Sequence, residues 1–341
     1  AKGHNFPLLA LVGVVDADAH GLKTVFIFGE VYPSSSGMTQ ERLLQMVVSV
    51  LLMAGFRVSE RFSMRPRSFD LISRDGDVVL VIKVVTHIDS VSEETARDLD
   101  HVARYLRGSP LIVGDRARDS ELERGAVYVR YGIFALSVAT LYDAFVEGIP
   151  PLVYASPGGL YVNINGEVLR TLRENRNLSL GDLGTLLGVS RRTISKYESG
   201  MGTTLEIAQK IEEIFDSALV RSIDLLTYRS VFEGEPEQGE EESPMSFLER
   251  IGIKLHSMHR APFQALIEVS DHSILTGYGT TQKVVKRAAL IGNISQITGM
   301  HAMCVLTDYG KQKKIGKTLV IGERRLQALH DGEELIQLIN K

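Results

Sequence analysis

The spacing of apolar residues between positions 178 and 200 predicts two short helices joined by a tight turn. Residues three and four apart give the first helix an apolar face: Leu180, Leu183, Leu186 and Leu187. Ser179 precedes this helix as an N-cap, and Asp182 follows three residues later, close to the pattern of a capping box. Gly188 is expected to end the helix, because glycine adopts the left-handed backbone conformation at little cost.

The second helix of this pair is predicted to begin after Ser190, which caps it. Val189 fills the corner between the helices, and Ile194 and Tyr197 point inward. The outward face then carries three basic residues and, between positions 190 and 197, no acidic one: Arg191, Arg192 and Lys196. The pattern therefore predicts a helix-turn-helix with a basic outer face.

Apolar runs alternate with amphipathic segments in residues 38–150, which predicts an α/β domain. The run VVLVIKVV is β-branched and almost continuously apolar, as a buried strand should be. A turn at Asp75-Gly76-Asp77 precedes it. In chain order we expect a helix at 39–54, strands in RVSERF, SFDLISR and VVLVIKVV, a helix at 92–106, strands in SPLIVG and AVYVRYGI, and a helix at 137–147.

Segments rich in proline, glycine or glutamate connect the predicted domains. Pro157-Gly158-Gly159 indicates a turn between short strands and lacks the Gly-Lys-Ser/Thr of a phosphate-binding loop. After Phe215 we expect a short helical exit in SIDLLTYRSVF. Residues 233–243 then hold six glutamates and no basic residue, which is typical of a solvated linker.

Residues 245–341 predict a second α/β domain. The expected order is a helix at 245–258, a strand in PFQALIEVS, a helix at 281–298, strands in HAMCVLTD and KTLVIG, and a helix at 323–339 broken at Asp331-Gly332. In this domain HAMCVLTD is followed by KTLVIGERRL, as SPLIVG is followed by AVYVRYGIFAL in the first domain. The parallel order suggests an internal duplication around the helix-turn-helix. Its thirteen lysines and arginines against eight acidic residues could follow a phosphate backbone or serve solubility alone.

The composition fits a globular protein of two or three domains, with 341 residues, 44% hydrophobic and 23% charged. Cys304 is the single cysteine, so an internal disulfide and a zinc cluster are excluded and a reducing compartment is favoured. No apolar run reaches the length of a membrane span, and no signal peptide is evident. His256 and His259 are three apart on a predicted helix, but no third metal ligand is placed, so packing or surface roles are favoured.

An outward basic helix suits the major groove of DNA, where arginine and lysine donate to guanine O6 and N7. The alternative is a solvated helix in an ordinary bundle. Residues 167–215 resemble the Cro/repressor-like (XRE) family of helix-turn-helix domains. The resemblance implies that Arg173 pairs with Glu198 at the end of the second helix. It also implies a set of residues that contact double-stranded DNA: Ser179, Ser190, Arg191, Arg192, Thr193, Lys196 and Ser199.

Two positions depart from that family's pattern. The small residue inside the first helix of the pair is usually alanine and is Gly184 here, which costs about 1 kcal/mol of helix stability. The residue after the cap is usually polar and is Leu180 here. The departure at Leu180 removes one expected contact with a phosphate.

The element order of the first domain resembles the restriction-endonuclease-like fold, notably archaeal Holliday-junction resolvases. That resemblance implies a metal site made by a helix glutamate, an aspartate and an E-x-K pair, onto which Glu41, Asp70 and Lys83 fall. The E-x-K glutamate is Val81 here, and a hard cation needs several oxygen ligands. We therefore expect the fold without its catalysis. The second domain also lacks the set, because Glu268-Val269-Ser270 contains no lysine.

Residues 1–37 differ in character from the rest of the chain. The stretch AKGHNFPLLALVGVVDADA resembles a short motif of the primosomal replication helicase, but without a P-loop it implies no ATPase. Met38 follows SSSG and has the look of a natural start. We interpret residues 1–37 as a fusion or a mis-started extension, and a genuine N-terminal hairpin is the alternative.

From residue 38 onward the chain resembles an archaeal family of helix-turn-helix transcriptional regulators, through SFDLI, VIKV, GIPPLVYASPGGLYVNI and VSRRTISKYESGM. We expect an α/β plus all-α protein: a Cro/repressor-like helix-turn-helix domain (151–232) between nuclease-like α/β domains (38–150 and 245–341), with an acidic linker (233–244). The implied function is sequence-specific regulation of transcription by a cytoplasmic homodimer that is not an enzyme. We expect no cofactor, no metal and no membrane contact, and a partner in the transcription machinery is left undefined. Two alternatives are a metal-dependent nuclease guided by the helix-turn-helix and a DNA-bound scaffold for protein partners.

Overall fold

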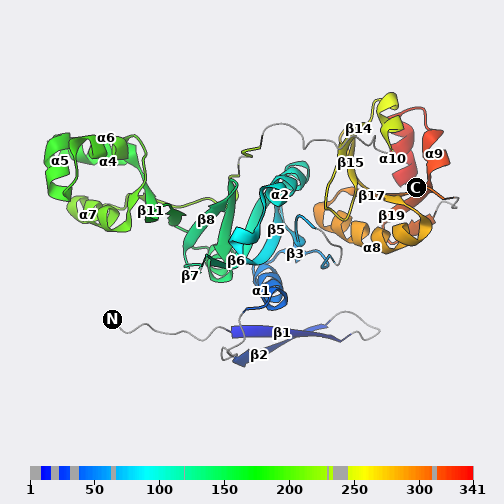
Figure 1. Ribbon diagram of the computed structural model, residues 1–341, viewed down its shortest axis with the longest axis horizontal. Coiled ribbons are helices and arrows are strands. Elements are labelled where there is room, and N and C mark those ends of the chain that lie inside the picture. The colour runs from blue at the N-terminus through cyan, green and yellow to red at the C-terminus, as the bar shows by residue number, and fades with distance from the viewer. Residues whose placement is uncertain are drawn as a thin grey trace.

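The computed structural model describes residues 9–16, 23–30, 38–62, 67–118, 120–228, 230–232, 245–308 and 313–340. Three bodies lie along the long axis of the molecule in Figure 1. They are a helix bundle (166–215) at one end, a first α/β unit (38–145) in the middle and a second α/β unit (245–340) at the other end. Strands β1 (Leu9–Asp16) and β2 (Lys23–Glu30) pair antiparallel in a separate two-stranded sheet.

The first α/β unit is a mixed sheet covered by helices on both faces. Its elements are α1 (Gln40–Met53), β3 (Arg57–Val58), β4 (Leu71–Asp75), β5 (Val78–His87), η1 (Ile88–Ser90), α2 (Glu93–Tyr105), β6 (Ser109–Ala117), β7 (Ser120–Glu121), β8 (Ala126–Arg130), β9 (Ile133–Ser137) and α3 (Val138–Phe145). The main strands lie in the order β8-β9-β6-β5-β4-β3. The predicted helices begin where their caps place them, because Thr39, Ser92 and Ser137 each accept a backbone N–H.

Strand β5 is apolar along its length because its two faces enter different cores. Val81 and Val85 pack with α2, whereas Leu80 and Ile82 pack with α1 and α3. The strand predicted in AVYVRYGI is present as β8 but ends at Arg130: the chain turns back at Tyr131 and Gly132, so that β8 and β9 pair antiparallel. Both turn residues have positive φ, 49° and 81°, as a two-residue hairpin turn of type I′ requires.

The second α/β unit repeats this arrangement strand for strand. Its elements are η2 (Ser246–Ile251), β14 (Lys254–Ser257), β15 (Ala265–Val269), β16 (His272–Gly279), α8 (Thr281–Thr298), β17 (His301–Leu306), β18 (Lys313–Ile315), β19 (Thr318–Gly322), α9 (Glu323–Gln327) and α10 (Gly332–Asn340). The strand order is β18-β19-β17-β16-β15-β14, and each neighbouring pair runs in the same relative direction as its counterpart in the first unit.

The correspondence extends to individual hydrogen bonds. Before β4, Asp70 N donates to Ile82 O at 2.8 Å, and its Oδ2 accepts from Val84 N at 2.8 Å. Before β15, Gln264 N donates to Thr276 O at 2.9 Å, and its Oε1 accepts from Tyr278 N at 2.7 Å. Asp70 and Gln264 therefore occupy equivalent places in the two sheets.

Three sequence predictions for the second unit are wrong or incomplete. The helix expected at 245–258 is the short 3-10 turn η2 followed by strand β14. Gly252, with φ of +79°, ends the turn, and Leu255 then pairs with Ile267 of β15. Strands β16 and β18 were not predicted, although His272–Gly279 forms the central strand beside β15 and β17.

One hydrophobic core continues from the first unit into the second. It joins α2 and one face of β5 to α8 and the corresponding face of β16. The polar contacts across it are reciprocal: His101 Nε2 on α2 lies 3.2 Å from Ser257 O, and Glu60 N donates to Asn293 Oδ1 on α8 at 2.8 Å. Glu60 corresponds to Ser257 in the matched sheets, and His101 and Asn293 lie on the corresponding helices α2 and α8, so the units exchange similar contacts, as at a two-fold interface.

A narrow arm of strands connects the first unit to the helix bundle. It contains β10 (Val153–Ser156), β11 (Gly159–Ile164), β12 (Thr203–Thr204) and β13 (Val220–Arg221). Strand β10 pairs parallel with β8, and β10 and β11 flank the predicted turn at Pro157-Gly158. The helices of the bundle are α4 (Gly166–Asn175), α5 (Leu180–Leu187), α6 (Arg191–Glu198) and α7 (Leu205–Phe215).

The helical exit predicted for residues 222–232 is wrong. The described part of this segment contains no helix: Ile223 and Leu225 enter the core of the first unit, and Leu225 and Leu226 form a turn. The Leu226 carbonyl accepts from Ser109 Oγ at 2.9 Å, and Tyr228 OH donates to Asp100 at 2.7 Å. The segment therefore returns from the bundle along the surface of the first unit.

Candidate nucleic-acid interface

Local side-chain hydrogen bonds set the two helices of the helix-turn-helix. Ser179 Oγ accepts from Asp182 N at 3.1 Å, and Asp182 Oδ2 accepts from Ser179 N at 2.8 Å, which completes the predicted capping box. This bonding to Ser179 lowers the pKa of Asp182. Ser190 caps α6 in the same way, since its Oγ accepts from Thr193 N at 3.1 Å.

Two glycines allow the tight turn between α5 and α6: Gly188 at the end of α5 and Gly184 within it. Gly188 ends α5 with φ of +69°, as predicted. Gly184 lies so close to the start of α6 that a β-carbon there would come within 2.7 Å of Val189 O. The absence of a side chain at Gly184 therefore allows the two helices to approach.

The inward and outward faces of α6 are as predicted, and that of α5 is partly different. Ile194 and Tyr197 are buried, whereas the basic residues are exposed. Leu186 was predicted to face inward but is 58% exposed, because Leu183 and Leu187 already occupy the inward arc of this short helix. Three side chains make no ion pair with any residue that the structure describes: Arg191, Arg192 and Lys196.

The predicted hydroxyl sites surround this basic face. Ser179, Ser190 and Ser199 are exposed, and Thr193 is half-buried. The hydroxyls of Ser190 and Thr193 lie 2.8 Å apart, and Ser199 Oγ donates to Ser195 O at 2.8 Å. Each hydroxyl keeps further hydrogen-bonding capacity toward solvent.

The predicted ion pair between Arg173 and Glu198 is present and buried. Arg173 Nε donates to Glu198 Oε1 at 2.5 Å, and Nη2 donates to Oε2 at 3.2 Å. The hydrogen bonds to Glu198 raise the pKa of Arg173. Arg173 also donates to Leu178 O at 2.8 Å, so one guanidinium connects α4, the start of α5 and the end of α6.

The sequence did not predict a second arginine at this carboxylate. Arg170 Nε lies 3.3 Å from Glu198 Oε2, and its side chain is 58% exposed. Arg170 precedes Arg173 by three residues on α4, so helical spacing alone places both on one face. That spacing is the signal that could have found it.

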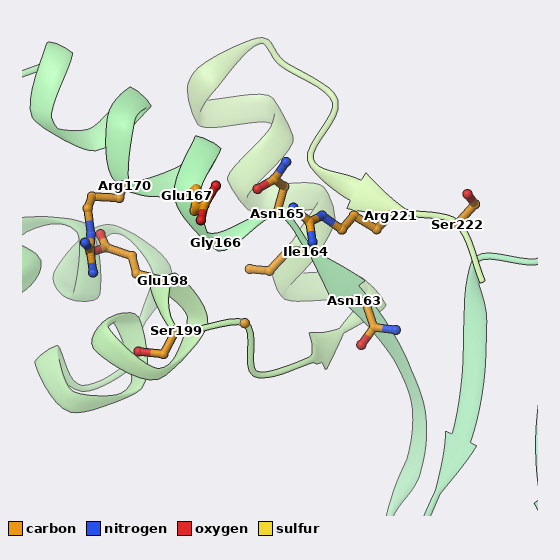
Figure 2. Close-up of a pocket in the computed structure, with 11 residues that line it drawn as sticks. Asn163, Ile164, Asn165, Gly166, Glu167, Arg170, Glu198, Ser199, Arg221 and Ser222 are labelled. Carbon is orange, nitrogen blue, oxygen red and sulfur yellow. The ribbon is translucent and has the colours of Figure 1, made fainter. Parts of the chain in front are cut away.

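A hollow of about 600 Å³ lies between the start of α4 and the end of α6. Its floor is the end of β11, and β13 forms its far side. Figure 2 shows Arg170 beside Glu198 at one end of this hollow and Arg221 near Asn165 at the other. We call it the α4–α6 hollow. Its lining residues are Asn163, Ile164, Asn165, Gly166, Glu167, Arg170, Glu198, Ser199, Gly200, Arg221 and Ser222.

Of the three residues expected at a nuclease metal site, Asp70 and Lys83 lie together, whereas Glu41 lies on the other side of the sheet. Glu41 forms an exposed ion pair with Arg61, and its helix α1 packs on the face of the sheet opposite Lys83. Asp70 is buried and bonds instead to the guanidinium of Arg67, a contact that the sequence did not reveal. Among the residues that the structure describes, no group of three or more His, Cys, Asp or Glu could hold a metal ion.

Lysine and arginine fill the surroundings of Asp70. Lys83 Nζ is 3.5 Å from Asp70 Oδ2 and donates to Arg67 O at 2.9 Å. Burial lowers the pKa of Lys83. The second unit covers this region, because Ser68 N donates to Arg260 O at 3.0 Å. His256 lies on strand β14 beside Glu268, so the predicted helical pair with His259 is wrong.

Two family models match the chain. Residues 40–151 match a PD-(D/E)XK superfamily domain, and residues 169–220 match a helix-turn-helix. These ranges coincide with the first α/β unit and with the bundle described above. The protein is therefore of the class that combines a helix-turn-helix DNA-binding domain with a PD-(D/E)XK-type domain, and no described helix is long and apolar enough to span a membrane.

Archaeal relatives extend this similarity to most of the chain. A protein of Methanosphaerula palustris is 65% identical over 303 residues, which are 89% of this chain and 100% of that protein. Relatives in Methanoculleus marisnigri and Archaeoglobus fulgidus are 62% and 38% identical over 89% and 88% of this chain, and 100% and 97% of their own lengths. Each is named "Putative HTH-type transcriptional regulatory protein". No solved structure matches.

The chain belongs to this archaeal family of HTH-type transcriptional regulatory proteins. The membership agrees with the resemblance seen in the sequence, and the helix-turn-helix is that of a DNA-binding regulator.

Proposed function

We propose that the protein regulates transcription by reading a specific duplex sequence with α6. The observation that carries this proposal is the basic face of α6, where Arg191, Arg192 and Lys196 are exposed and make no ion pair with a described residue. An unpaired guanidinium is free to donate two hydrogen bonds to guanine O6 and N7. These three side chains are assigned to base reading.

The hydroxyl residues are assigned to the edges of the same interface. Ser179 and Ser190 lie at the starts of α5 and α6, and Ser199 lies at the end of α6. Hydroxyls at these positions donate to phosphate oxygens, which fixes the orientation of the helix without reading sequence. Thr193, one turn into α6, is assigned with them.

The active species in this proposal is a homodimer in the cytoplasm. Each chain carries one matched helix-turn-helix. Dimeric regulators of this kind bind half-sites about 34 Å apart along one side of the duplex. Two chains therefore supply the two reading helices that a palindromic operator needs.

We further propose that residues 38–150 and 245–341 are two copies of one nuclease-type fold that perform no cleavage. The matched strand order and the equivalent hydrogen bonds of Asp70 and Gln264 support a duplication. The loss of catalysis is supported by Val81 at the carboxylate position, and in the second copy by Gly277 at the position of Lys83. In this division residues 151–232 are the DNA-reading domain, 233–244 the acidic linker and 1–37 a separate leader.

Selection of bound duplexes from a random DNA pool tests the main proposal. A single enriched motif with two half-sites is expected. Replacing Arg191, Arg192 or Lys196 by alanine should weaken binding to that motif by about 1–3 kcal/mol for each residue that contacts a base. Each variant should also relax the preference at one base pair. The reading of α6 is wrong if all three variants bind the selected duplex as the parent protein does.

The same experiment separates the alternatives. A scaffold for protein partners would give no enriched motif and no footprint on DNA. A guided nuclease would enrich a motif but cut it when magnesium or manganese is added.

A further inference from the structure

Arg221 in the α4–α6 hollow has no charge partner among the described residues. Arg221 of β13 is exposed, and its guanidinium makes no ion pair or side-chain hydrogen bond with a residue that the structure describes. Arg221 lies directly opposite Asn163 of β11 in antiparallel register, so both side chains project from one face of the strand pair. Both line the hollow.

The other charges of the hollow are largely balanced. Glu198 is neutralised by Arg173 and Arg170. The start of α4 and the end of α6 meet here, because the backbone of Gly166 packs against the carbonyls of Tyr197 and Glu198. Helix ends of opposite polarity offset each other. Glu167 remains at the rim, so the attraction of the hollow for an anion depends on Arg221.

The hollow borders the helix that is proposed to read DNA. Ser199 and Gly200, which directly follow α6, form one of its walls. Lys196, one of the proposed reading residues, precedes Ser199 by three residues, so about one helical turn separates the hollow from the base-reading face. The sugar-phosphate strands border the groove in which such a helix lies.

The form of the hollow decides between a DNA phosphate and a small effector. Effector pockets are mostly apolar and bury about 70–90% of their ligand. Here eight of the eleven lining residues are polar and six are exposed, including Arg170, Ser199, Arg221 and Ser222. Figure 2 shows these residues spread along an open hollow between α4, α6 and β13. An extended polyanion that passes across the surface fits this form.

We propose that the α4–α6 hollow seats a backbone phosphate of the DNA strand beside α6, with Arg221 as its charged contact. Asn163 is the neighbouring hydrogen-bond donor. The proposal rests on the proposed function of α6 and extends the DNA contact to β13, which lies outside the two helices of the helix-turn-helix. A phosphate contact carries no sequence information, so it adds affinity equally for all duplexes.

The test replaces Arg221 by alanine in the full-length protein. We expect binding to the selected duplex and to a scrambled duplex to weaken by the same factor, about tenfold. The slope of log affinity against log salt concentration should become less steep by about 0.9, the value for one lost phosphate contact. Arg221→Lys keeps the charge and should restore the slope, with part of the affinity.

Arg57→Ala is the matched control. Arg57 is an exposed arginine on β3 of the first α/β unit, so its loss changes the net charge equally without touching the hollow. Arg57→Ala should leave the salt slope unchanged. An equal change of slope in both variants would assign the effect to net charge and overturn the proposal.

Two further outcomes are informative. If Arg191→Ala weakens binding while Arg221→Ala does not, the hollow proposal fails and the reading function stands. Free phosphate is the other possible source of the same chemistry. Inorganic phosphate titrated at constant ionic strength should leave the Gly166 and Gly200 amide signals unchanged in the absence of DNA. A saturable shift of those signals, together with phosphate-dependent operator affinity, would identify an effector site instead and overturn the proposal.

Discussion

At the scale of the residue, Gly184 shows how a local preference can be overruled by packing. Helix propensity favours alanine over glycine by about 1 kcal/mol inside α5. A β-carbon at Gly184 would lie 2.7 Å from the backbone oxygen of Val189, and backbone cannot give way as a side-chain tip can. The contact with the next helix therefore decides the residue.

Alanine at position 184 is expected to destabilise the helix bundle. The strain of separating α5 from α6, about 1–3 kcal/mol for overpacking, exceeds the gain in helix propensity. Gly181→Ala on the same helix is the control, because its β-carbon would meet only Ser179 Oγ at 3.6 Å. That control should raise the free energy of unfolding by about 0.5–1 kcal/mol. Denaturant titration measures both, and a stabilising Gly184→Ala would contradict the packing argument.

Asp98 is a second residue at which the surroundings act against the residue's own preference, because they disfavour its ionised carboxylate. It is buried on α2 between the two α/β units, its Oδ2 accepts no hydrogen bond, and Arg260 Nε is 3.5 Å away. Burial raises the pKa of Asp98 to about 6. The folded protein therefore holds this proton more tightly than the unfolded chain, so stability from this group is lost as pH rises from 3.8 to about 6.

Asp98→Asn should remove this dependence. We expect a higher melting temperature than the parent protein at pH 7–8 and little difference near pH 4, where Asp98 is protonated anyway. Asp89 is the opposite case, because a hydrogen bond from Arg118 N lowers its pKa, so Asp89→Asn should lower the melting temperature at pH 7. Melts across this pH range decide the matter, and a uniform effect of Asp98→Asn at all pH values would contradict it.

At the scale of the element, the orientation of α6 depends on a buried ion pair. Glu198 ends α6, and Arg173 lies near the end of α4, with side-chain exposures of 4% and 11%. Such a pair fixes geometry more than it adds net stability, because both charges lose their hydration on burial. Removing one partner leaves the other charge buried.

Glu198→Ala is expected to destabilise the bundle by about 3–5 kcal/mol, since Arg173 then lies buried without this carboxylate. Glu174→Ala removes an exposed carboxylate 3.4 Å from the same arginine and should cost less than about 1 kcal/mol. Hydrogen exchange of the α6 amides in the full-length protein compares the two. Equal protection in both variants would show that the buried pair does not brace the helix.

At the scale of the whole molecule, the two α/β units cover the faces on which a nuclease would act. Lys83 belongs to the side of β5 that packs against α2 and continues into the core of the second unit. The backbone of Arg260 lies against Ser68, two residues before Asp70. The two units would have to move apart before a phosphodiester group of DNA could reach Asp70.

The full-length protein with magnesium or manganese should therefore not cut duplex, branched or single-stranded DNA. Metal-assisted cleavage needs carboxylates that converge on the cation, and Asp70 already bonds to Arg67, Lys83 and Val84 N. Val81→Glu should destabilise the protein rather than restore activity, because Val81 is fully buried. Cleavage that disappears in Asp70→Ala would contradict this expectation and support the nuclease alternative.

The sequence by itself determined the elements whose causes are local. The helix-turn-helix was predicted almost residue by residue, because caps at Ser179 and Ser190 and the turn at Gly188 act within a few residues. Strand β5 was predicted because a run of β-branched residues suits a strand buried on both faces. Family resemblance supplied the pairing of Arg173 with Glu198, which are far apart in sequence.

Only the tertiary structure decided the rest. Residues 245–258 and 222–232 carry apolar residues compatible with an α-helix. Pairing with β15 instead makes residues 254–257 a strand, and contact with the first unit holds the described part of 222–232 without a helix. The partners of Asp70 and the reciprocal contacts of His101 and Asn293 join residues that no local pattern connects. Local hydrogen bonds depend on residues that are close in sequence, and these can be recognised from the sequence alone. Strand pairing and shared burial depend on which distant segments come into contact in the folded protein.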